Sequence, residues 1–318
     1  MCQMKPSEFV RRLFVVEKGE GMEAKWITPA VTAMNESGHV DFEANSRIYD
    51  NLIASGMDGI LILGSIGEFF AIPWNEKKEM IKRSLEAVRG RVKVYVGTGQ
   101  MELDRCVELS NYALDQGADG VVVISPFYIN LPDSAVLNFY GQVAEQVKGD
   151  IFLYNFPART GYDLRPDLVY RLAAGYKNIV GIKDTVGDMG HTRAMIRKLK
   201  KDFPDFQIYS GFDEFFGHNV LSGGDGCIAG LSNFAPELAA GYAKAARRND
   251  LAEMCRYQRK IDGLMDIYGV GQQFIPIIKK AIVLRGIAME PYCAQPMLAA
   301  TEKETEEIRR ILSEGGLL

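Results

Sequence analysis

The feature that most restricts the fold of this chain is a regular alternation of short apolar runs with amphipathic stretches of helical periodicity. The apolar runs are rich in β-branched residues and do not alternate with polar residues, which is typical of parallel strands covered on both faces. These runs lie at residues 26–32, 59–63, 92–97, 120–124, 151–154, 179–183, 207–209 and 226–229. Helical patterns fill the intervals, among them 75–89, 102–116, 133–147, 189–200 and 236–248.

The number and size of these units predict the architecture. Each strand with its helix takes about thirty residues, the size of a βαβ unit. Eight units in series favour a single (β/α)8 TIM barrel over an open doubly wound sheet, and no Gly-x-Gly-x-x-Gly turn follows the first run. The chain stays helical afterwards, at 250–268, 272–285 and 301–312. We therefore predict an N-terminal extension over 1–24, a catalytic barrel over 25–248 and an all-helical region over 249–318 that packs on the barrel.

Composition argues against several classes of protein. The 318 residues are 47% hydrophobic and 25% charged, and the net charge of -4 does not suit a broad nucleic-acid-binding surface. No apolar run has transmembrane length, and residues 1–21 lack the hydrophobic core of a signal peptide. Whether residues 1–21 are a flexible extension or precede the true start at Met22 stays open. We expect a cytoplasmic protein that binds neither membranes nor nucleic acid.

Cysteine and histidine spacing gives no sign of a metal site. The five cysteines are scattered without a Cys-x-x-Cys pair, which indicates reduced thiols of a cytosolic protein. The three histidines have no metal-ligand spacing. We therefore expect no bound metal.

Lys183 is the residue that most strongly suggests chemistry. It ends the apolar run 179–183, which reads as a buried strand. Because burying an unpaired ammonium is costly, two interpretations are open. The side chain either reaches solvent or a carboxylate such as Asp184, or it is an amine nucleophile that condenses with ketones.

Other predicted strand ends also carry polar groups, and in a TIM barrel these ends form one face. Gly64-Ser65-Ile66-Gly67-Glu68 can form a tight turn in which the N–H groups of Ser65 and Ile66 bind the carboxylate of a keto acid. Tyr128 follows the fourth run and Tyr154 ends the fifth; with Ser65, they provide hydroxyls for a proton relay beside Lys183. A plain connecting turn and packed tyrosines are the alternative interpretations.

Charged groups follow the fifth and seventh runs. Arg159 either pairs with a substrate carboxylate or holds its own loop through a salt bridge. Asp213 and Glu214 follow Gly211, and carboxylates there would accept hydrogen bonds from sugar hydroxyls but repel an anionic aldehyde. The eighth run leads into Gly230.

Four spaced motifs resemble those of the dihydrodipicolinate synthase / N-acetylneuraminate lyase family of Schiff-base aldolases. They are Gly64-Ser65-Ile66-Gly67-Glu68, Tyr154-Asn155-Phe156-Pro157 with Thr160-Gly161, Gly181-Ile182-Lys183-Asp184-Thr185 and Ser232-Asn233-Phe234-Ala235-Pro236. The resemblance covers nearly the whole chain from Trp26 onward, and the motifs follow the predicted strands in order. It implies a TIM barrel with a helical C-terminal region, usually a homotetramer built from tight dimers.

The resemblance also implies roles for single residues. Lys183 would form an imine with pyruvate or another 2-keto acid, which requires no separate cofactor. Tyr154 would move protons between the imine and the substrate hydroxyl. Ser65, in place of the family's first threonine, would link Tyr154 to Tyr128, and the tyrosine at the latter position reaches in from the neighbouring subunit. Thr185 matches a threonine that contacts substrate in the lyase and sugar-acid aldolase branches.

The branch of the family is less clearly marked. Ile66 replaces the second threonine of the first motif, and Arg159 resembles the arginine that binds the aldehyde carboxylate in the synthase branch. The stretch 154–236 resembles the 2-keto-3-deoxy sugar-acid aldolases most. The expected substrate-binding residues are Ile66, Arg159, Thr185, Gly211, Asp213, Glu214 and Gly230.

We predict reversible aldol cleavage of a 2-keto-3-deoxy sugar acid into pyruvate and an aldehyde. The alternative is 4-hydroxy-tetrahydrodipicolinate synthase, which condenses pyruvate with aspartate semialdehyde. A dehydratase acting on the same imine and a non-catalytic keto-acid-binding paralogue are further alternatives.

Overall fold

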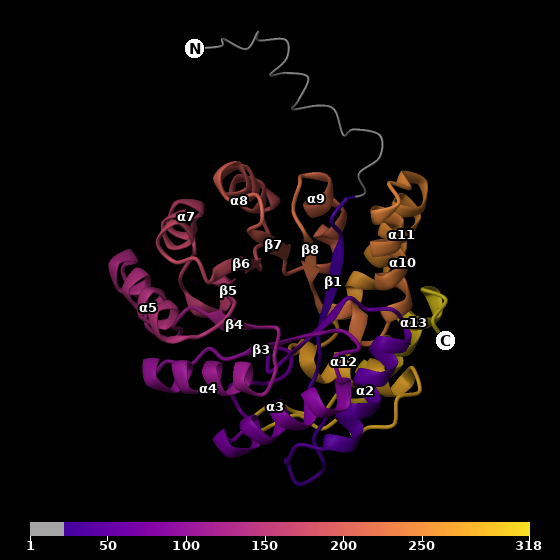
Figure 1. Ribbon diagram of the computed structural model, residues 1–318. Helices are drawn as coiled ribbons and strands as arrows, with labels where there is room; N and C mark the ends of the chain where they lie inside the picture. Colours follow the sequence, from indigo (N-terminus) through magenta and orange to yellow (C-terminus); the bar gives the residue numbers. More distant parts are fainter. Residues whose placement is uncertain (1–21) are drawn as a thin grey trace.

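The computed structural model describes residues 22–318 and shows a closed barrel of eight parallel strands surrounded by helices (Figure 1). The strands follow one another in chain order, and β1 pairs with β8 to close the barrel. They are β1 Lys25–Pro29, β2 Gly59–Ile62, β3 Lys93–Gly97, β4 Gly120–Ile124, β5 Ile151–Asn155, β6 Ile179–Asp184, β7 Gln207–Ser210 and β8 Gly226–Ile228. The TIM barrel predicted from the alternation is therefore confirmed.

The largest error in the predicted strand ends falls on β1. The apolar run continues to residue 32, but the strand ends at Pro29. Beyond it, the Val31 N–H donates to the Asn233 side chain at 3.0 Å and the Ala33 N–H donates to the Asn45 side chain at 3.1 Å. Because these N–H groups donate to side chains and not to a neighbouring strand, the residues after Pro29 do not extend β1, although they stay buried.

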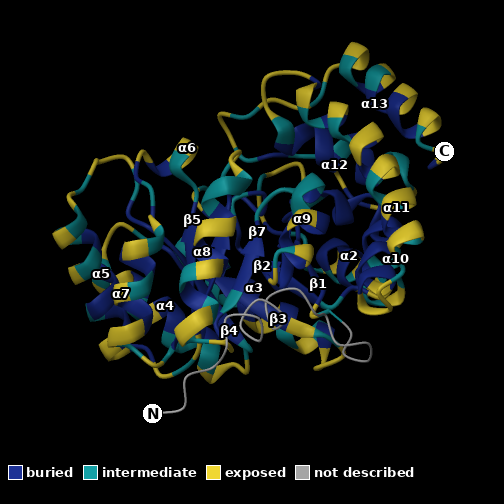
Figure 2. Ribbon diagram, turned by 90° about the horizontal axis from the view of Figure 1, so that it is seen from above, coloured by how far each residue is buried: buried dark blue, intermediate teal, exposed yellow. Residues whose placement is uncertain are grey.

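Several of the helices that cover the barrel begin at a capping side chain or a proline. Asp41 accepts a hydrogen bond from the Ala44 N–H at the start of its helix, and Pro166 and Pro236 each occupy a first turn. The inward faces are buried and the outward faces exposed (Figure 2). The helices are α2 Phe42–Ala54, α3 Trp74–Val88, α4 Leu103–Asp115, α5 Asp133–Gln146, α7 Pro166–Gly175, α8 Met189–Asp202, α9 Phe216–Leu221 and α10 Pro236–Arg247.

The last helices gather on one side of the barrel (Figure 1). They are α11 Leu251–Leu264, the 3-10 turn η3 Met265–Gly269, α12 Phe274–Leu284 and α13 Glu302–Glu314. The predicted helix over 250–268 therefore changes into a tighter turn at Met265. The short helix α6, Pro157–Thr160, lies with α12 at the same end of the barrel (Figure 2). The three-segment division stays a prediction, and most of its first segment lies outside the described residues.

Aromatic side chains fill the middle of the barrel. The ring of Phe152 lies 5.3 Å from that of Tyr95 and 6.3 Å from that of Tyr209. A Cβ atom at Gly181 would lie 2.6 Å from the Phe152 ring, so close packing explains the glycine two residues before Lys183. No helix within residues 22–318 has the length and apolar character needed to cross a membrane.

Candidate active site

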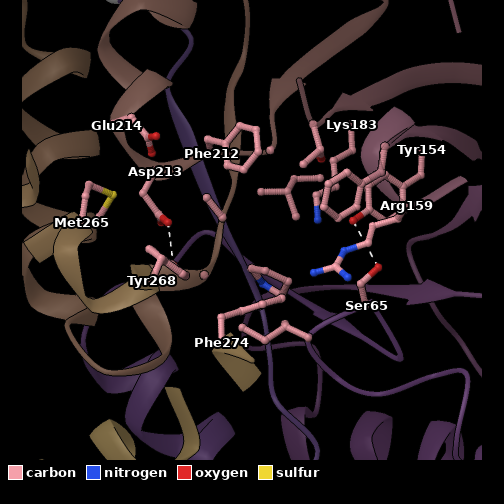
Figure 3. Close-up of a pocket in the computed structure, with 18 residues that line it drawn as sticks. Ser65, Tyr154, Arg159, Lys183, Phe212, Asp213, Glu214, Met265, Tyr268 and Phe274 are labelled. Carbon is pink, nitrogen blue, oxygen red and sulfur yellow. Dashed lines mark hydrogen bonds between the residues drawn. The ribbon is translucent and has the colours of Figure 1, made fainter. Parts of the chain in front are cut away.

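A cavity of about 310 Å³ opens at the carboxyl ends of the strands (Figure 3). Its size falls in the range of small-molecule sites. Ten of the predicted site residues line it: Ser65, Ile66, Tyr154, Arg159, Lys183, Thr185, Gly211, Asp213, Glu214 and Gly230. The remaining walls are mainly apolar and come from both the barrel and the last helices: Pro29, Phe156, Phe212, Ile228, Ala229, Met265, Tyr268 and Phe274. Within residues 22–318, no group of three or more metal-binding side chains is placed to hold an ion.

Lys183 projects into this cavity as a buried amine. Its side chain is 4% exposed, and its Nζ lies 4.4 Å from the centre of the Tyr154 ring. No acidic side chain of residues 22–318 forms an ion pair with it. Asp184 lies on the other side of the strand, where it accepts hydrogen bonds from Asn155 and Thr192, since successive strand residues point to opposite faces. The interpretation of Lys183 as a solvent-reaching or Asp184-paired lysine is therefore wrong.

Tyr154 and Ser65 are brought together from opposite parts of the barrel. Tyr154 is the direct neighbour of Lys183 in the pairing of β5 with β6. Its hydroxyl lies 3.3 Å from the Ser65 Oγ, which follows β2. Leu63 and Glu68, which flank the Ser65 turn, have φ of 54° and 58°. Non-glycine residues with positive φ concentrate at functional sites, where the surroundings enforce the strain.

A buried ion pair holds the Ser65 turn from behind. Glu68 contacts the Nζ of Lys279 on α12, and both side chains are fully buried. Lys279 also donates to the carbonyl of Tyr292 at 2.6 Å, and Glu68 accepts from the Ala294 N–H at 2.7 Å. The last helices are thus tied to the turn that carries Ser65. Nothing in the local sequence pattern indicated Lys279 as the partner of Glu68.

Asp213 and Tyr268 form a hydrogen-bonded pair on the opposite side of the cavity from Arg159 (Figure 3). Asp213 accepts from the Tyr268 hydroxyl at 2.8 Å and from the Leu231 N–H at 2.9 Å. Burial raises the pKa of Asp213 to about 7 and outweighs these two hydrogen bonds, which act in the other direction. Burial also raises the pKa of Glu214. Each oxygen of Asp213 already accepts a hydrogen bond from the protein. Asp213 is therefore less available to accept hydrogen bonds from sugar hydroxyls than its position in the sequence predicts.

Thr185 presents a free hydroxyl to the cavity. Its Oγ1 is buried and has no hydrogen-bond partner among the described residues. A Cβ atom at position 211 would lie 1.9 Å from this oxygen, so Gly211 is required where it stands. A buried hydroxyl without a partner needs an explanation, and a substrate oxygen in the cavity would provide one.

Arg159 lies on α6, near Tyr154 and Ser65 (Figure 3). Its guanidinium lies 5.9 Å from the ring centres of both Phe156 and Phe274. It forms no salt bridge within residues 22–318, so the interpretation of Arg159 as a salt-bridged loop anchor is wrong for this part of the chain. The exposed guanidinium is left available to an anionic group at the mouth.

Tyr128 is the exception among the predicted catalytic residues. It is 94% exposed, has φ of 74° and does not line the cavity. The preceding Phe127 packs on Phe69 with ring centres 6.0 Å apart. The expectation that Tyr128 points at the same mouth is therefore wrong for a single chain. A contribution of Tyr128 to a neighbouring subunit stays a prediction.

Comparison with known proteins adds independent evidence. Residues 22–315 match the model of the dihydrodipicolinate synthetase family. The chain is 37% identical to YjhH of Escherichia coli K12, named a probable 2-dehydro-3-deoxy-D-pentonate aldolase, over 92% of this chain and 97% of YjhH. It is also 33% identical to the 4-hydroxy-tetrahydrodipicolinate synthase of Kosmotoga olearia, over 91% of this chain and 97% of the synthase.

A solved structure gives the same result for the fold. YagE of E. coli K12, crystallised in complex with pyruvate, superposes with a TM-score of 0.91 at 35% identity. The match covers 93% of this chain and 99% of YagE. The name of YagE proposes a 2-dehydro-3-deoxy-D-gluconate aldolase activity for that protein.

Proposed function

The chain belongs to the dihydrodipicolinate synthetase family of lyases, and from that membership we propose that it is a pyruvate-dependent Schiff-base aldolase. Its reaction is the reversible cleavage of a 2-keto-3-deoxy sugar acid to pyruvate and an aldehyde. The observation that carries the proposal is the Lys183 amine, buried in the cavity above the Tyr154 ring and without a carboxylate partner among the described residues. An amine held in this way suits covalent catalysis on a ketone.

In the proposed reaction, the Nζ of Lys183 attacks C2 of the 2-keto acid, and loss of water leaves a protonated imine. Removal of the proton from the C4 hydroxyl lets the C3–C4 bond break. Its electron pair moves into the imine to form an enamine, and the aldehyde departs. Protonation of the enamine at C3 followed by hydrolysis of the imine releases pyruvate and restores the amine. Condensation follows the same steps in reverse.

The neighbouring groups support these steps. We assign to Tyr154 the transfer of the C4 hydroxyl proton, because its ring faces the amine and its hydroxyl is hydrogen-bonded to Ser65. The N–H groups of Ser65 and Ile66 are proposed to hold the substrate carboxylate, since convergent N–H groups in a tight turn bind anions.

The proposed reaction uses only small-molecule substrates, and we propose that the protein acts in a reducing compartment. The imine itself supplies the electron sink, so the reaction requires neither a metal nor an organic cofactor. Cys106, Cys227, Cys255 and Cys293 are free thiols, as a reducing cytoplasm maintains them.

Residues on the side of the cavity opposite Arg159 favour a sugar acid as the substrate. The unpartnered Thr185 hydroxyl and the half-buried Glu214 offer a donor and an acceptor to a polyhydroxylated substrate, and the names of YjhH and YagE point the same way. The second candidate is 4-hydroxy-tetrahydrodipicolinate synthase, and the observation that favours it is Arg159, an exposed guanidinium able to bind the carboxylate of aspartate semialdehyde.

A substrate screen tests this choice. Pyruvate release is measured from 2-keto-3-deoxy-gluconate, 2-keto-3-deoxy-pentonates and N-acetylneuraminate, beside condensation of pyruvate with aspartate semialdehyde. We expect cleavage of at least one 2-keto-3-deoxy sugar acid at a kcat/KM of about 10⁴ M⁻¹s⁻¹ or more, the range of ordinary enzymes, and none of N-acetylneuraminate. Turnover with aspartate semialdehyde alone would replace the first candidate by the second.

The variant Arg159→Leu sharpens the screen. If the synthase assignment holds, the loss is confined to the aldehyde that bears a carboxylate. If the aldolase assignment holds, Arg159 donates hydrogen bonds to neutral hydroxyls of the sugar acid instead of binding a charge, so cleavage continues with a raised KM.

We also propose a homo-oligomer, a tetramer built from tight dimers. The loops after β2, β3 and β4 expose a cluster of large apolar side chains, with Phe70 55%, Met101 40%, Tyr128 94% and Ile129 54% exposed. The strained backbone of Tyr128 has no role in its own subunit's cavity. Light scattering after gel filtration should give four times the mass of the chain, and Ile129→Asp should dissociate the assembly. A monomer at micromolar concentration would contradict the proposal.

A further inference from the structure

The strand ends that carry Tyr154 and Lys183 are joined behind the cavity by a second set of polar residues. The pairing of β5 with β6 aligns Tyr154 with Lys183 and Asn155 with Asp184. Since alternate residues face opposite sides, the first pair faces the cavity and the second faces the helices. Asn155 donates its Nδ2 hydrogen bond to Asp184 at 2.9 Å. The geometry of the two catalytic strand ends is therefore fixed from outside the barrel.

His191, in the first turn of α8, lies between two carboxylates of this set. Its Nδ1 is hydrogen-bonded to the Oδ2 of Asp184 at 3.0 Å, and its buried Nε2 lies 3.4 Å from the Oδ1 of Asp163, an ion-pair contact in place of a hydrogen bond. Thr192 donates to the same Asp184 oxygen at 2.7 Å. The imidazole is largely buried, with 15% of its side chain exposed. It therefore spans the distance between β6 and the segment that contains Asp163.

The segment that contains Asp163 also carries Arg159. It runs from α6 to the start of α7, and Asn155 holds it by a bond from Nδ2 to Asp163 and by one from the Leu164 N–H to Oδ1, each 2.9 Å long. Asp163 is 37% exposed, so its charge is partly screened by solvent. Its contact with His191 is the second attachment of this segment to the back of the catalytic strands.

We propose that His191 is a positioning residue: when protonated, it bridges Asp184 and Asp163 and thereby holds the Arg159 segment against the strand end that bears Lys183. The inference rests on the function proposed above, because it concerns how the aldehyde half of the substrate is held. Only the imidazolium has a donor on both nitrogens. A neutral His191 that keeps its hydrogen bond to Asp184 turns a bare lone pair towards Asp163, and the bridge is lost.

The surroundings of His191 favour its charged form. Burial is the largest single influence and lowers its pKa. The hydrogen bond to Asp184 and the charges of Asp184, Asp163 and Asp188, the N-cap of α8, together outweigh burial and raise the pKa above 6.5. A group whose pKa is raised by folding stabilises the fold fully below its unfolded pKa. That contribution disappears as the pH rises through the folded pKa, and the bridge disappears with it.

The experiment combines an NMR titration with steady-state kinetics on the full-length protein. The imidazole of His191 is titrated in ¹³C-histidine-labelled protein and assigned by its absence in His191→Gln. The KM and kcat for cleavage of the 2-keto-3-deoxy sugar acid are then measured against pH. We expect His191 to titrate above 6.5, and the wild-type KM to rise on the order of tenfold through that pH, the usual effect of losing an orienting partner, while kcat changes little.

Two variants and a control separate positioning from simple structural support. His191→Gln and Asp163→Asn should both have the higher KM at every pH and show no pH step. Asp163→Asn keeps the contact of His191 with Asp184, so it still tests the bridge if His191→Gln does not fold. The control His218→Gln, at an exposed histidine of α9, should behave like wild type. A raised KM with an unchanged pH step, or a His191 that titrates at or below 6.5, would overturn the inference. Failure to trap pyruvate on Lys183 would instead remove the proposed function, while the titration would still report on the bridge.

Discussion

Replacement of Lys183 by alanine is expected to lower sugar-acid cleavage by on the order of 10⁴-fold or more, the effect seen when a covalent nucleophile is removed. Without the amine there is no imine, and the C3–C4 bond has no electron sink. The measurement has two parts: steady-state release of pyruvate, and reduction with borohydride in the presence of pyruvate followed by mass spectrometry. Wild type should gain one covalent adduct on the peptide containing Lys183, and Lys183→Ala should gain none.

A second buried lysine provides a matched control for the trapping experiment. Lys77 on α3 lies outside the cavity, and burial lowers its pKa. It therefore tests whether a buried amine reacts with pyruvate merely because its pKa is low. Lys77→Ala should keep both turnover and the adduct. An adduct that persists in Lys183→Ala, or one that maps to Lys77, would show that the imine forms elsewhere.

The variant Lys279→Met is expected to destabilise the protein by about 3–5 kcal/mol, the usual result of removing one member of a buried ion pair. The substitution leaves the Glu68 carboxylate fully buried, with the Ala294 N–H as its one remaining donor among residues 22–318. It also frees the turn that carries Ser65 from the last helices, so the KM for the keto acid should rise as well. The midpoint of urea denaturation, followed by circular dichroism, gives the change in stability.

The neighbouring lysine and the double variant complete this test. Lys280→Met changes the next, partly exposed position of α12 and should shift the midpoint by a small fraction of that amount. Glu68→Gln combined with Lys279→Met should recover part of the loss, because no uncompensated charge stays buried. Equal effects of Lys279→Met and Lys280→Met would mean that the ion pair contributes little.

The sequence was sufficient to predict most of the site because the barrel collects residues from regular positions. Ser65, Tyr154, Lys183 and Asp213 are far apart along the chain, but each lies at or just after the carboxyl end of a parallel strand, and these ends meet at one face. The eight apolar runs were enough to locate those ends to within a few residues. Gly211 could be named from its motif, but only the structure shows that the Thr185 side chain leaves no room for a Cβ there.

The errors and omissions concern contacts that no local pattern encodes. Tyr268 and Lys279 come from the last helices, whose placement on the barrel depends on tertiary packing rather than on periodicity. The position of Tyr128 after β4 predicts a side chain at the cavity, yet Tyr128 is almost fully exposed and does not line the cavity. Sequence spacing alone predicts no role for His191, because its partners Asp184 and Asp163 lie on other elements.

The contribution of the last helices to the cavity sets the time at which the enzyme can become active. Lys183 and the strands around it are synthesised well before Tyr268 and Phe274, which wall the cavity, and before Lys279, which secures the Ser65 turn. Domains generally fold as units while synthesis proceeds from the N-terminus. The reactive amine is therefore enclosed only after the segment that carries Tyr268, Phe274 and Lys279 has been synthesised.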